Sequence, residues 1–239
     1  MNFPRKTGAG LLAAVFVPFA LQAADLWQAG AGRVRITPVQ EMWMAGYGSR
    51  ARPAEGKVTD LWAKALVLDD GKGNRGVIVT LDLVGIDREI AGKVCVRLKK
   101  ELGLERHQIS LCTSHTHSGP VVGQNLAPLH YAILDPEQQE LIDDYAEGLP
   151  KRVSMAVKGA IDVLAPVKVQ WGSGKAVFAV NRRENKPYGA VPDLRARGAL
   201  KGPVDHDVPV LSVRGEGGEL RAVLFGYACH ATTLSFQQW

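Results

Sequence analysis

The sequence predicts an α/β protein in which helices pack against a mixed sheet of largely antiparallel hairpins plus βα units. Segments with strand patterns and segments with helical patterns alternate along the 239 residues, which favours the α/β class. Two pairs of strand segments are separated by short Gly-containing linkers typical of hairpins, so a purely parallel sheet is not expected. The length suits one large domain or two small ones with a substantial core.

The first strands follow from alternation and turn chemistry. Residues 33–38 alternate apolar and polar side chains, as a half-buried strand does. Two β-rich runs, 62–68 and 76–83, lie on either side of linker 69–75, which contains Asp, Gly and Asn. Such linkers favour tight turns, so this region is predicted to be a hairpin.

Two helices are expected, over 88–102 and 136–164, because apolar residues recur there at three- and four-residue spacing. Asp87 is placed to cap the first helix. Gly148 and Pro150 should kink the second helix or split it in two, since proline removes a helical hydrogen bond.

The remaining strand patterns include one that precedes a histidine motif and two that flank the Gly-rich linker 214–219. A Gly- and Pro-containing basic loop, 184–203, is expected to be mobile or to cover a pocket. The predicted strands cover residues 109–113, 167–171, 176–180, 208–213 and 221–228.

The segment 112–120, Cys-Thr-Ser-His-Thr-His-Ser-Gly-Pro, is the first candidate site. In an extended chain, residues two apart point to the same side, so His115 and His117 can face one pocket. Neutral imidazole is a common zinc ligand, and a strand end that delivers two of them indicates a metal site. The alternative is a surface loop, or one satisfied buried histidine beside an exposed one, since His-x-His alone is a weak motif.

A second strand end, far along the chain, also carries a histidine. The predicted strand 221–228 leads into Cys-His-Ala-Thr-Thr, which contains His230. Together with His115 and His117 it would supply three imidazoles, the number of protein ligands usual at a catalytic zinc, although one of them could instead orient a ligand. His206 is a weaker candidate, because the aspartates on either side fit a turn.

Other polar residues lie at predicted strand ends. Asp82 could join the histidine site or serve as a turn or capping carboxylate, and Asn181 and Arg182 follow the predicted strand 176–180. The Gly- and aromatic-containing loop 42–48 either lines a pocket or is a connection packed by its own side chains.

Charge and cysteine content exclude some classes of function. The net charge of +5 is mild, and no Lys/Arg cluster with interleaved aromatic residues occurs, so no nucleic-acid partner is expected. Three cysteines, Cys95, Cys112 and Cys229, are too few for a disulfide scaffold. We expect small core residues, with a Cys112–Cys229 bridge as the alternative.

Residues 1–24 resemble a secretory signal peptide: two basic residues precede a short apolar run that ends in small residues, with cleavage expected near Ala23. An uncleaved anchor is the rival, disfavoured by Pro18 and by the shortness of the run. The sequence therefore predicts a secreted or periplasmic protein.

Four motifs in order, residues 44–48, 114–120, 181–182 and 227–233, resemble the N-terminal catalytic domain of neutral/alkaline non-lysosomal ceramidases and their bacterial relatives. His-Thr-His-Ser-Gly-Pro is the most specific of them. The resemblance covers nearly the whole chain after the signal segment, 25–239. It implies a zinc-dependent amidase that cleaves ceramide into sphingosine and a fatty acid, with a ceramide-like lipid amide as substrate and peripheral contact with membranes or lipid aggregates.

The resemblance also implies roles for single residues. His115 and His230 match zinc ligands, His117 matches a companion histidine at the substrate or reacting centre, and Arg182 matches an arginine that holds the amide oxygen or its oxyanion. In the family a glutamate and a tyrosine ligand and a catalytic serine in a Gly-Asp-x-Ser segment follow the second histidine. This chain ends at Trp239 without them, so we expect an incomplete catalytic domain, and Ala231 indicates a divergent bacterial branch.

Three other interpretations compete. A metallo-β-lactamase would need Asp and His where Gly119 and Pro120 stand, and a TIM-barrel amidohydrolase would carry its His-x-His on the first strand. A secreted, non-catalytic lipid- or carbohydrate-binding domain with structural histidines remains the alternative from another functional class.

Overall fold

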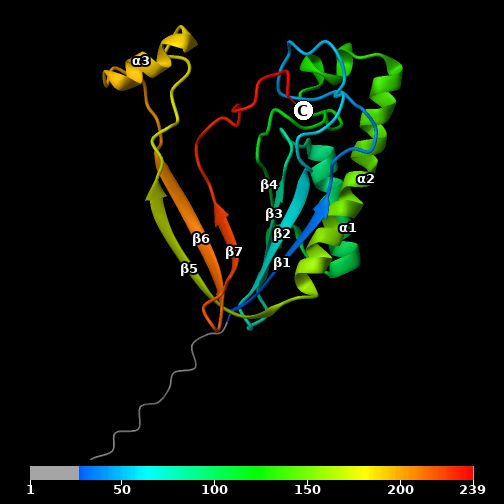
Figure 1. Cartoon of the computed structure of the whole chain (residues 1–239). Coiled ribbons are helices and arrows are strands. Elements are labelled where there is room, and N and C mark those ends of the chain that lie inside the picture. The colour runs from blue at the N-terminus through cyan, green and yellow to red at the C-terminus, as the bar shows by residue number, and fades with distance from the viewer. Residues whose placement is uncertain (1–26, 239) are drawn as a thin grey trace, which may run out of the picture.

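The computed structural model describes residues 27–238, which contain a seven-stranded mixed sheet (Figure 1). The predicted signal segment, 1–24, lies outside the described residues. The strands are β1 (Trp27–Arg35), β2 (Trp62–Asp69), β3 (Arg75–Leu81), β4 (Ile109–Thr113), β5 (Ala165–Lys175), β6 (Asp207–Gly215) and β7 (Leu220–Phe225), and the helices are α1 (Arg88–Leu102), α2 (Pro136–Ile161) and α3 (Val191–Ala196).

The sheet has the strand order β4-β3-β2-β1-β5-β6-β7. β3 and β4, which are connected through α1, pair in parallel, and every other neighbouring pair is antiparallel. The fold class is therefore the predicted mixed α/β one. β4 and β7, the strands that precede the two histidine segments, lie at opposite edges of this sheet.

The sheet has two parts that diverge in Figure 1 from a common junction. The covered half consists of β1–β4 with α1 and α2 packed on one face, and the open half consists of β5–β7 with α3 beyond the far end of β5 and β6. β1 pairs with β2 over eight residue pairs but with β5 over only three, from Trp27 to Ala29. The junction between the halves is thus short.

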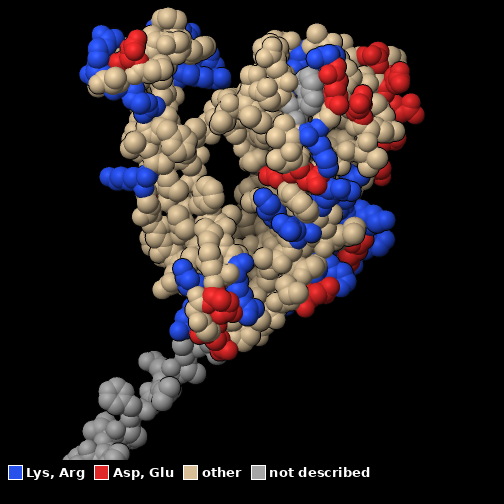
Figure 2. Space-filling view, viewed as in Figure 1, with Lys and Arg blue, Asp and Glu red and all other residues tan. Residues whose placement is uncertain are grey.

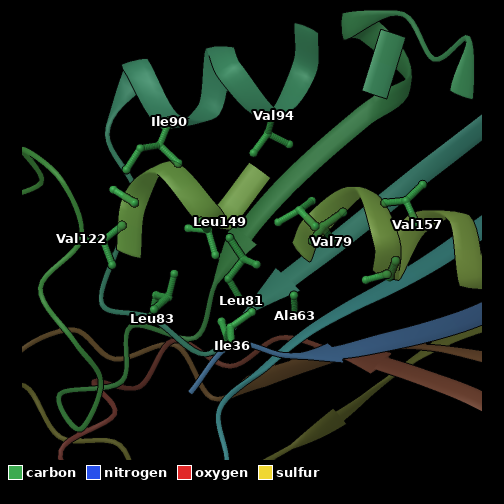
Figure 3. Close-up of a cluster of buried hydrophobic side chains, with 14 of the residues drawn as sticks. Ile36, Ala63, Val79, Leu81, Leu83, Ile90, Val94, Val122, Leu149 and Val157 are labelled. Atoms are coloured by element: carbon green, nitrogen blue, oxygen red, sulfur yellow. The ribbon is translucent and has the colours of Figure 1, made fainter. Parts of the chain in front are cut away.

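The main core lies between the covered half of the sheet and its two helices (Figure 3). α2 lies directly on β1, because a Cβ at Gly30 or Gly32 would come within 2.0 and 2.3 Å of the α2 backbone oxygens of Ala160 and Ala156. The labelled side chains of Figure 3 belong to this core, among them Ile36, Leu81, Leu83, Val94 and Leu149.

Several predicted elements are confirmed. α1 has the predicted bounds, and the Asp87 side chain accepts a hydrogen bond from the Ile90 backbone N–H, as an N-cap does. The two predicted hairpins, β2–β3 and β6–β7, are present, and so is the short strand β4.

The second helix is not split in two, so that part of the prediction for Gly148 and Pro150 is wrong. α2 continues through Pro150, which is buried with its neighbours Leu149 and Val153 in the core. A proline within a helix costs roughly 3 kcal/mol, and burial of this apolar helix face offsets that cost.

Three strand predictions also need correction. Residues 176–180 form no strand, because the β5–β6 ladder ends at the pair Lys175 and Asp207. The last strand ends at Phe225 rather than continuing to residue 228, since the next partner on β6 is Pro209, which has no N–H to donate. The first strand is β1, which begins at Trp27 and ends at Arg35 instead of spanning 33–38.

Two of the three cysteines differ from expectation. Cys112 and Cys229 are exposed rather than in the core, whereas Cys95 is half-buried and packs against the main core. All three are free thiols, so the alternative Cys112–Cys229 bridge is not found. In the basic loop 184–203, the structure contains the short helix α3. Within residues 27–238, no helix combines the length and the apolar character needed to cross a membrane.

Candidate metal centre

His115 and His117 lie in the turn after β4. His115 has a φ of +53°, a left-handed conformation that is uncommon for a residue with a side chain and that clusters at functional sites. The His115 Nδ1 lies 2.7 Å from the Val84 carbonyl oxygen, in the loop between β3 and α1. A carbonyl only accepts, so Nδ1 carries the proton and Nε2 keeps a free lone pair.

His117 is the buried member of the motif, with 8% of its surface exposed. Its ring lies on the backbone of Gly46, where a Cβ would come within 2.4 Å of the His117 Cγ, and the Tyr47 ring meets it edge-on at 4.9 Å between centroids. Burial, assisted by the neighbouring His230 and His115 and then by the positive charges of Arg182 and Arg50, lowers the pKa of His117 to about 4. The ring is therefore neutral near pH 7, as a metal ligand must be.

His230 reaches the same place from the open half. It lies five residues after the end of β7, and the segment between is held by Tyr227, whose hydroxyl donates to the Ala176 oxygen at 2.7 Å and accepts from the Ala179 N–H at 3.0 Å. Burial, together with the neighbouring His115 and then the charge of Arg182, lowers the pKa of His230 below its ordinary value.

The three rings converge from opposite edges of the sheet. Their centroids lie 4.6 to 5.0 Å apart. The Nε2 of His117 lies 3.4 Å from that of His115 and 2.8 Å from that of His230. One ligand atom from each residue falls within 4.8 Å of the others.

Three imidazole nitrogens are a donor set that zinc accepts, and the spacing of one of the three pairs matches zinc coordination. Zinc binds histidine nitrogens at about 2.0–2.1 Å, so two tetrahedral ligand nitrogens lie about 3.3 Å apart, close to the His115–His117 separation of 3.4 Å. The 2.8 Å contact between His117 and His230 is a hydrogen-bond distance, so one of those nitrogens donates to the other. The Nδ1 of His117 is buried and has no hydrogen-bond partner among the described residues.

Arg182 lies in an exposed turn beside the cluster. The Asn181 side chain holds this turn by accepting hydrogen bonds from the backbone N–H groups of Arg183 and Glu184. The positive charge of Arg182 lowers the pKa of both His117 and His230, which places its guanidinium within electrostatic reach of both rings.

Two weaker candidates are not part of the cluster. The Asp82 carboxylate accepts a hydrogen bond from the Trp62 backbone N–H at 2.9 Å. It therefore binds backbone, in line with the turn or capping role that was the alternative to a place in the histidine site. His206 precedes β6, where its carbonyl accepts from the Ala176 N–H. Neither residue belongs to the group of potential metal ligands in the described chain.

Three residues around the cluster were not predicted from the sequence. Tyr47 and Arg50 contact His117 from the loop 42–50, and the buried His130 accepts a hydrogen bond from the Gly46 N–H at 3.2 Å. For the Gly- and aromatic-containing loop 42–48, the sequence left two interpretations: it lines a pocket, or it is a connection packed by its own side chains. The contacts with His117 favour the first.

The family model described as neutral/alkaline non-lysosomal ceramidase, N-terminal, matches residues 27–238. The chain belongs to this ceramidase family. The neutral ceramidase of Pseudomonas aeruginosa is 28% identical over 232 residues, and that of Drosophila melanogaster is 28% identical over 219 residues. These matches cover 94% and 87% of this chain.

Solved structures of ceramidases agree with the family assignment. The crystal structure of the neutral ceramidase from Pseudomonas aeruginosa aligns with 89% of the chain at a TM-score of 0.70 and 26% identity. A ceramidase complexed with C2 aligns with 87% of the chain at a TM-score of 0.68. The chain spans about one third of the length of these relatives, 33% of the Pseudomonas aeruginosa ceramidase and 29% of the Drosophila melanogaster one.

Proposed function

We propose that this chain carries the zinc-binding histidines of a hydrolase that cleaves the amide bond of ceramide-like lipids. The convergence of His115, His117 and His230 from opposite edges of one sheet is the observation that supports it most strongly. Family membership supports the amide as the reacting group, since the relatives are neutral ceramidases. Residues 25–239 would then form the N-terminal part of a ceramidase-like catalytic domain.

In this proposal His115 and His230 hold the ion, and each is prepared for it differently. The Val84 carbonyl fixes the tautomer of His115, and the segment fixed by Tyr227 delivers His230. A bound zinc ion supplies Lewis acidity and lowers the pKa of water. His117, kept neutral by burial, would then be the companion histidine that contacts the substrate or the reacting centre.

Arg182 would stabilise the negative charge that develops on the amide oxygen. It is an exposed cation, and its positive charge is one of the causes that lower the pKa of both His117 and His230, which supports a place for it near the reacting amide. Preorganised donors at such a position lower an acyl-transfer barrier by about 3 to 4 kcal/mol.

An apolar cavity supports a lipid as the substrate. It measures about 830 Å³, adjoins His230 between the two halves, and includes Trp171, Phe178, Leu211 and Phe225 in its lining. Alkyl chains gain about 0.8 kcal/mol for each CH₂ they bury. Such a substrate would be met at the surface of a membrane or lipid aggregate, and export through the segment 1–24 would place the domain in the periplasm or outside the cell.

A metal-binding experiment tests the site. The purified chain should bind one equivalent of zinc by isothermal titration. His115→Ala and His230→Ala should each lose it, whereas His117→Ala, which removes the 2.8 Å contact to His230, should weaken the binding without abolishing it. His107→Ala, at an exposed position, serves as the control. Absence of zinc binding in the wild type would contradict the hydrolase proposal and favour a non-catalytic binding domain.

A turnover experiment tests the chemistry. Release of sphingosine from a short-chain ceramide in detergent micelles should fall by about 100-fold or more in Arg182→Ala, with Arg183→Ala as the neighbouring control. Unchanged turnover in Arg182→Ala would refute its role. A wild-type chain that binds zinc but releases no sphingosine would leave the metal site standing and contradict hydrolysis by this chain.

A further inference from the structure

The candidate metal centre lies between the covered half and the open half, which are joined by a short strand pairing. His115 and His117 belong to the covered half, and His230 follows the opposite edge strand of the open half. Among residues 27–238, the strand pairing that joins the two halves is the short β1–β5 ladder at the far end of the molecule, beside the small buried cluster of Ala29, Leu66, Val167 and Val213 (Figure 1). The spacing between His117 and His230 therefore depends on contacts near the rings themselves.

Tyr47 makes contacts on both sides of this gap. Its hydroxyl donates a 2.7 Å hydrogen bond to the carbonyl oxygen of Leu234, four residues after His230. Its ring packs edge-on against His117, at 72° between the planes. A single side chain thus touches the buried histidine of one half and the backbone of the segment that carries the histidine of the other.

Arg50 contacts both Tyr47 and His117. It is only 9% exposed, and its Nη2 donates a 2.7 Å hydrogen bond to the His117 backbone oxygen. Its Nη1 reaches the Met44 sulfur at 3.2 Å, and its guanidinium lies 5.3 Å from the Tyr47 ring centroid.

No carboxylate among the described residues pairs with Arg50, so its burial is not explained by an ion pair. The guanidinium fork contacts a carbonyl, a thioether and an aromatic face together, which a lysine ammonium cannot reproduce. Its contacts converge on Tyr47 and on the backbone of His117.

We propose that Tyr47 and Arg50 are positioning residues that set the distance between His117 and His230. Tyr47 ties the segment 230–234 to the His115–His117 turn, and Arg50 fixes the Tyr47 ring and the His117 backbone. This inference deepens the proposed function, because it assigns residues that prepare the same metal centre, but the tie itself exists without any metal.

The test uses Tyr47→Phe in the full chain, with Tyr131→Phe as the matched control. Tyr131 also donates a hydroxyl hydrogen bond, 2.8 Å long, but to Asp143, away from the histidines. In metal-free protein, amide hydrogen exchange in residues 230–236 should become about fivefold faster in Tyr47→Phe, the factor that corresponds to one lost hydrogen bond. Exchange in Tyr131→Phe should match the wild type in that segment.

The second readout is the metal. Zinc affinity, measured by chelator competition, should fall by about tenfold in Tyr47→Phe, as for other residues that orient ligands. The visible spectrum of bound Co²⁺ should shift in this variant and not in Tyr131→Phe. Faster exchange with unchanged zinc affinity and an unchanged spectrum would make Tyr47 a structural tether only and overturn the proposal, and unchanged exchange would overturn the tie itself.

Arg50→Lys tests the other half of the proposal. It should lower zinc affinity by about tenfold, while Arg106→Lys, which also replaces a guanidinium bonded to a backbone carbonyl, should not. Unchanged affinity in Arg50→Lys would remove Arg50 from the proposal. If the wild type binds no zinc, the proposed function is contradicted, and the exchange comparison alone supports or overturns the tie.

Discussion

Val79, Leu81 and Leu149 of the covered half are fully buried between β3 and α2, whereas Trp171 and Phe225 of the open half are 85% and 67% exposed. Figure 2 shows the same contrast, with the two halves separated by a gap and few charged side chains over the middle of the open half. The covered half has its own core, while the four buried side chains of the smaller cluster, Ala29, Leu66, Val167 and Val213, bridge the junction. Stability is therefore concentrated in one half and the candidate metal centre depends on both.

The largest difference between the two halves is expected when one large side chain is removed from each and the free energies of unfolding are compared. Leu149→Ala should lower the free energy of unfolding by about 3 kcal/mol, because it leaves a cavity in a closed core. Trp171→Ala should change it by no more than about 0.5 kcal/mol, since the side chain is largely solvated. Urea denaturation followed by circular dichroism measures both. Equal losses would show that the open half is packed as tightly as the covered one.

A smaller effect is expected where the covered half meets the metal centre. Gly46→Ala should cost about 2 kcal/mol and also displace the His117 ring, because Gly46 has a φ of +97° and its Cβ would lie 2.4 Å from His117 Cγ.

Gly73→Ala is the matched control for this change. Its φ of +99° gives the same backbone strain, but nothing lies within 4 Å of the added Cβ. Denaturation and zinc titration of both variants should show similar strain but weaker zinc binding in Gly46→Ala alone. Equal zinc affinity in the two variants would disprove the contact.

The pH dependence of folding stability should also distinguish a buried histidine of the covered half from an exposed one. Burial, with a contribution from Arg50, lowers the pKa of His130 in the folded state. The unfolded chain then binds a proton near pH 6.5 that the folded state does not bind. Stability is fully present above that pH and decreases as the pH falls below it.

In His130→Gln this decrease should be shallower, and His107→Gln, which alters an exposed histidine, should leave it unchanged. Denaturation of metal-free protein between pH 7 and pH 5 measures the slopes. A slope in His130→Gln as steep as in the wild type would argue against a neutral buried His130.

The smallest effects are expected for the exposed cysteines. Cys112→Ser and Cys229→Ser should each change the unfolding free energy by less than about 0.5 kcal/mol, because both thiols are free and solvent-accessible. Thiol titration of the native protein should count both as reactive. A protected pair would indicate the disulfide that the structure does not contain.

The sequence predicted best where the signal was local. Asp87 and the spacing of Ile90, Val94 and Leu98 lie within one helix, and α1 has the predicted bounds. Asp, Gly and Asn between two strand patterns predicted the β2–β3 hairpin for the same reason. Predictions failed where a partner strand or a helix contact decided the outcome, as at Pro150 and at the end of β7 beside Pro209.

The site shows the same division. His115 and His117 were recognisable as a pair because a single residue separates them at one strand end, and His230 was added through its own strand-end motif. Tyr47, Arg50 and His130 could not be assigned roles from the sequence, since they reach His117 through contacts across 67 to 84 positions or through a glycine backbone. Such contacts depend on the tertiary fold.

The three-residue pairing of β1 with β5 makes the strand junction a pivot. A small rotation about this junction would displace the far ends of both halves by a larger distance. An ion bound by imidazoles from both halves would hold their far ends together. Metal occupancy and the angle between the two halves should therefore be thermodynamically linked.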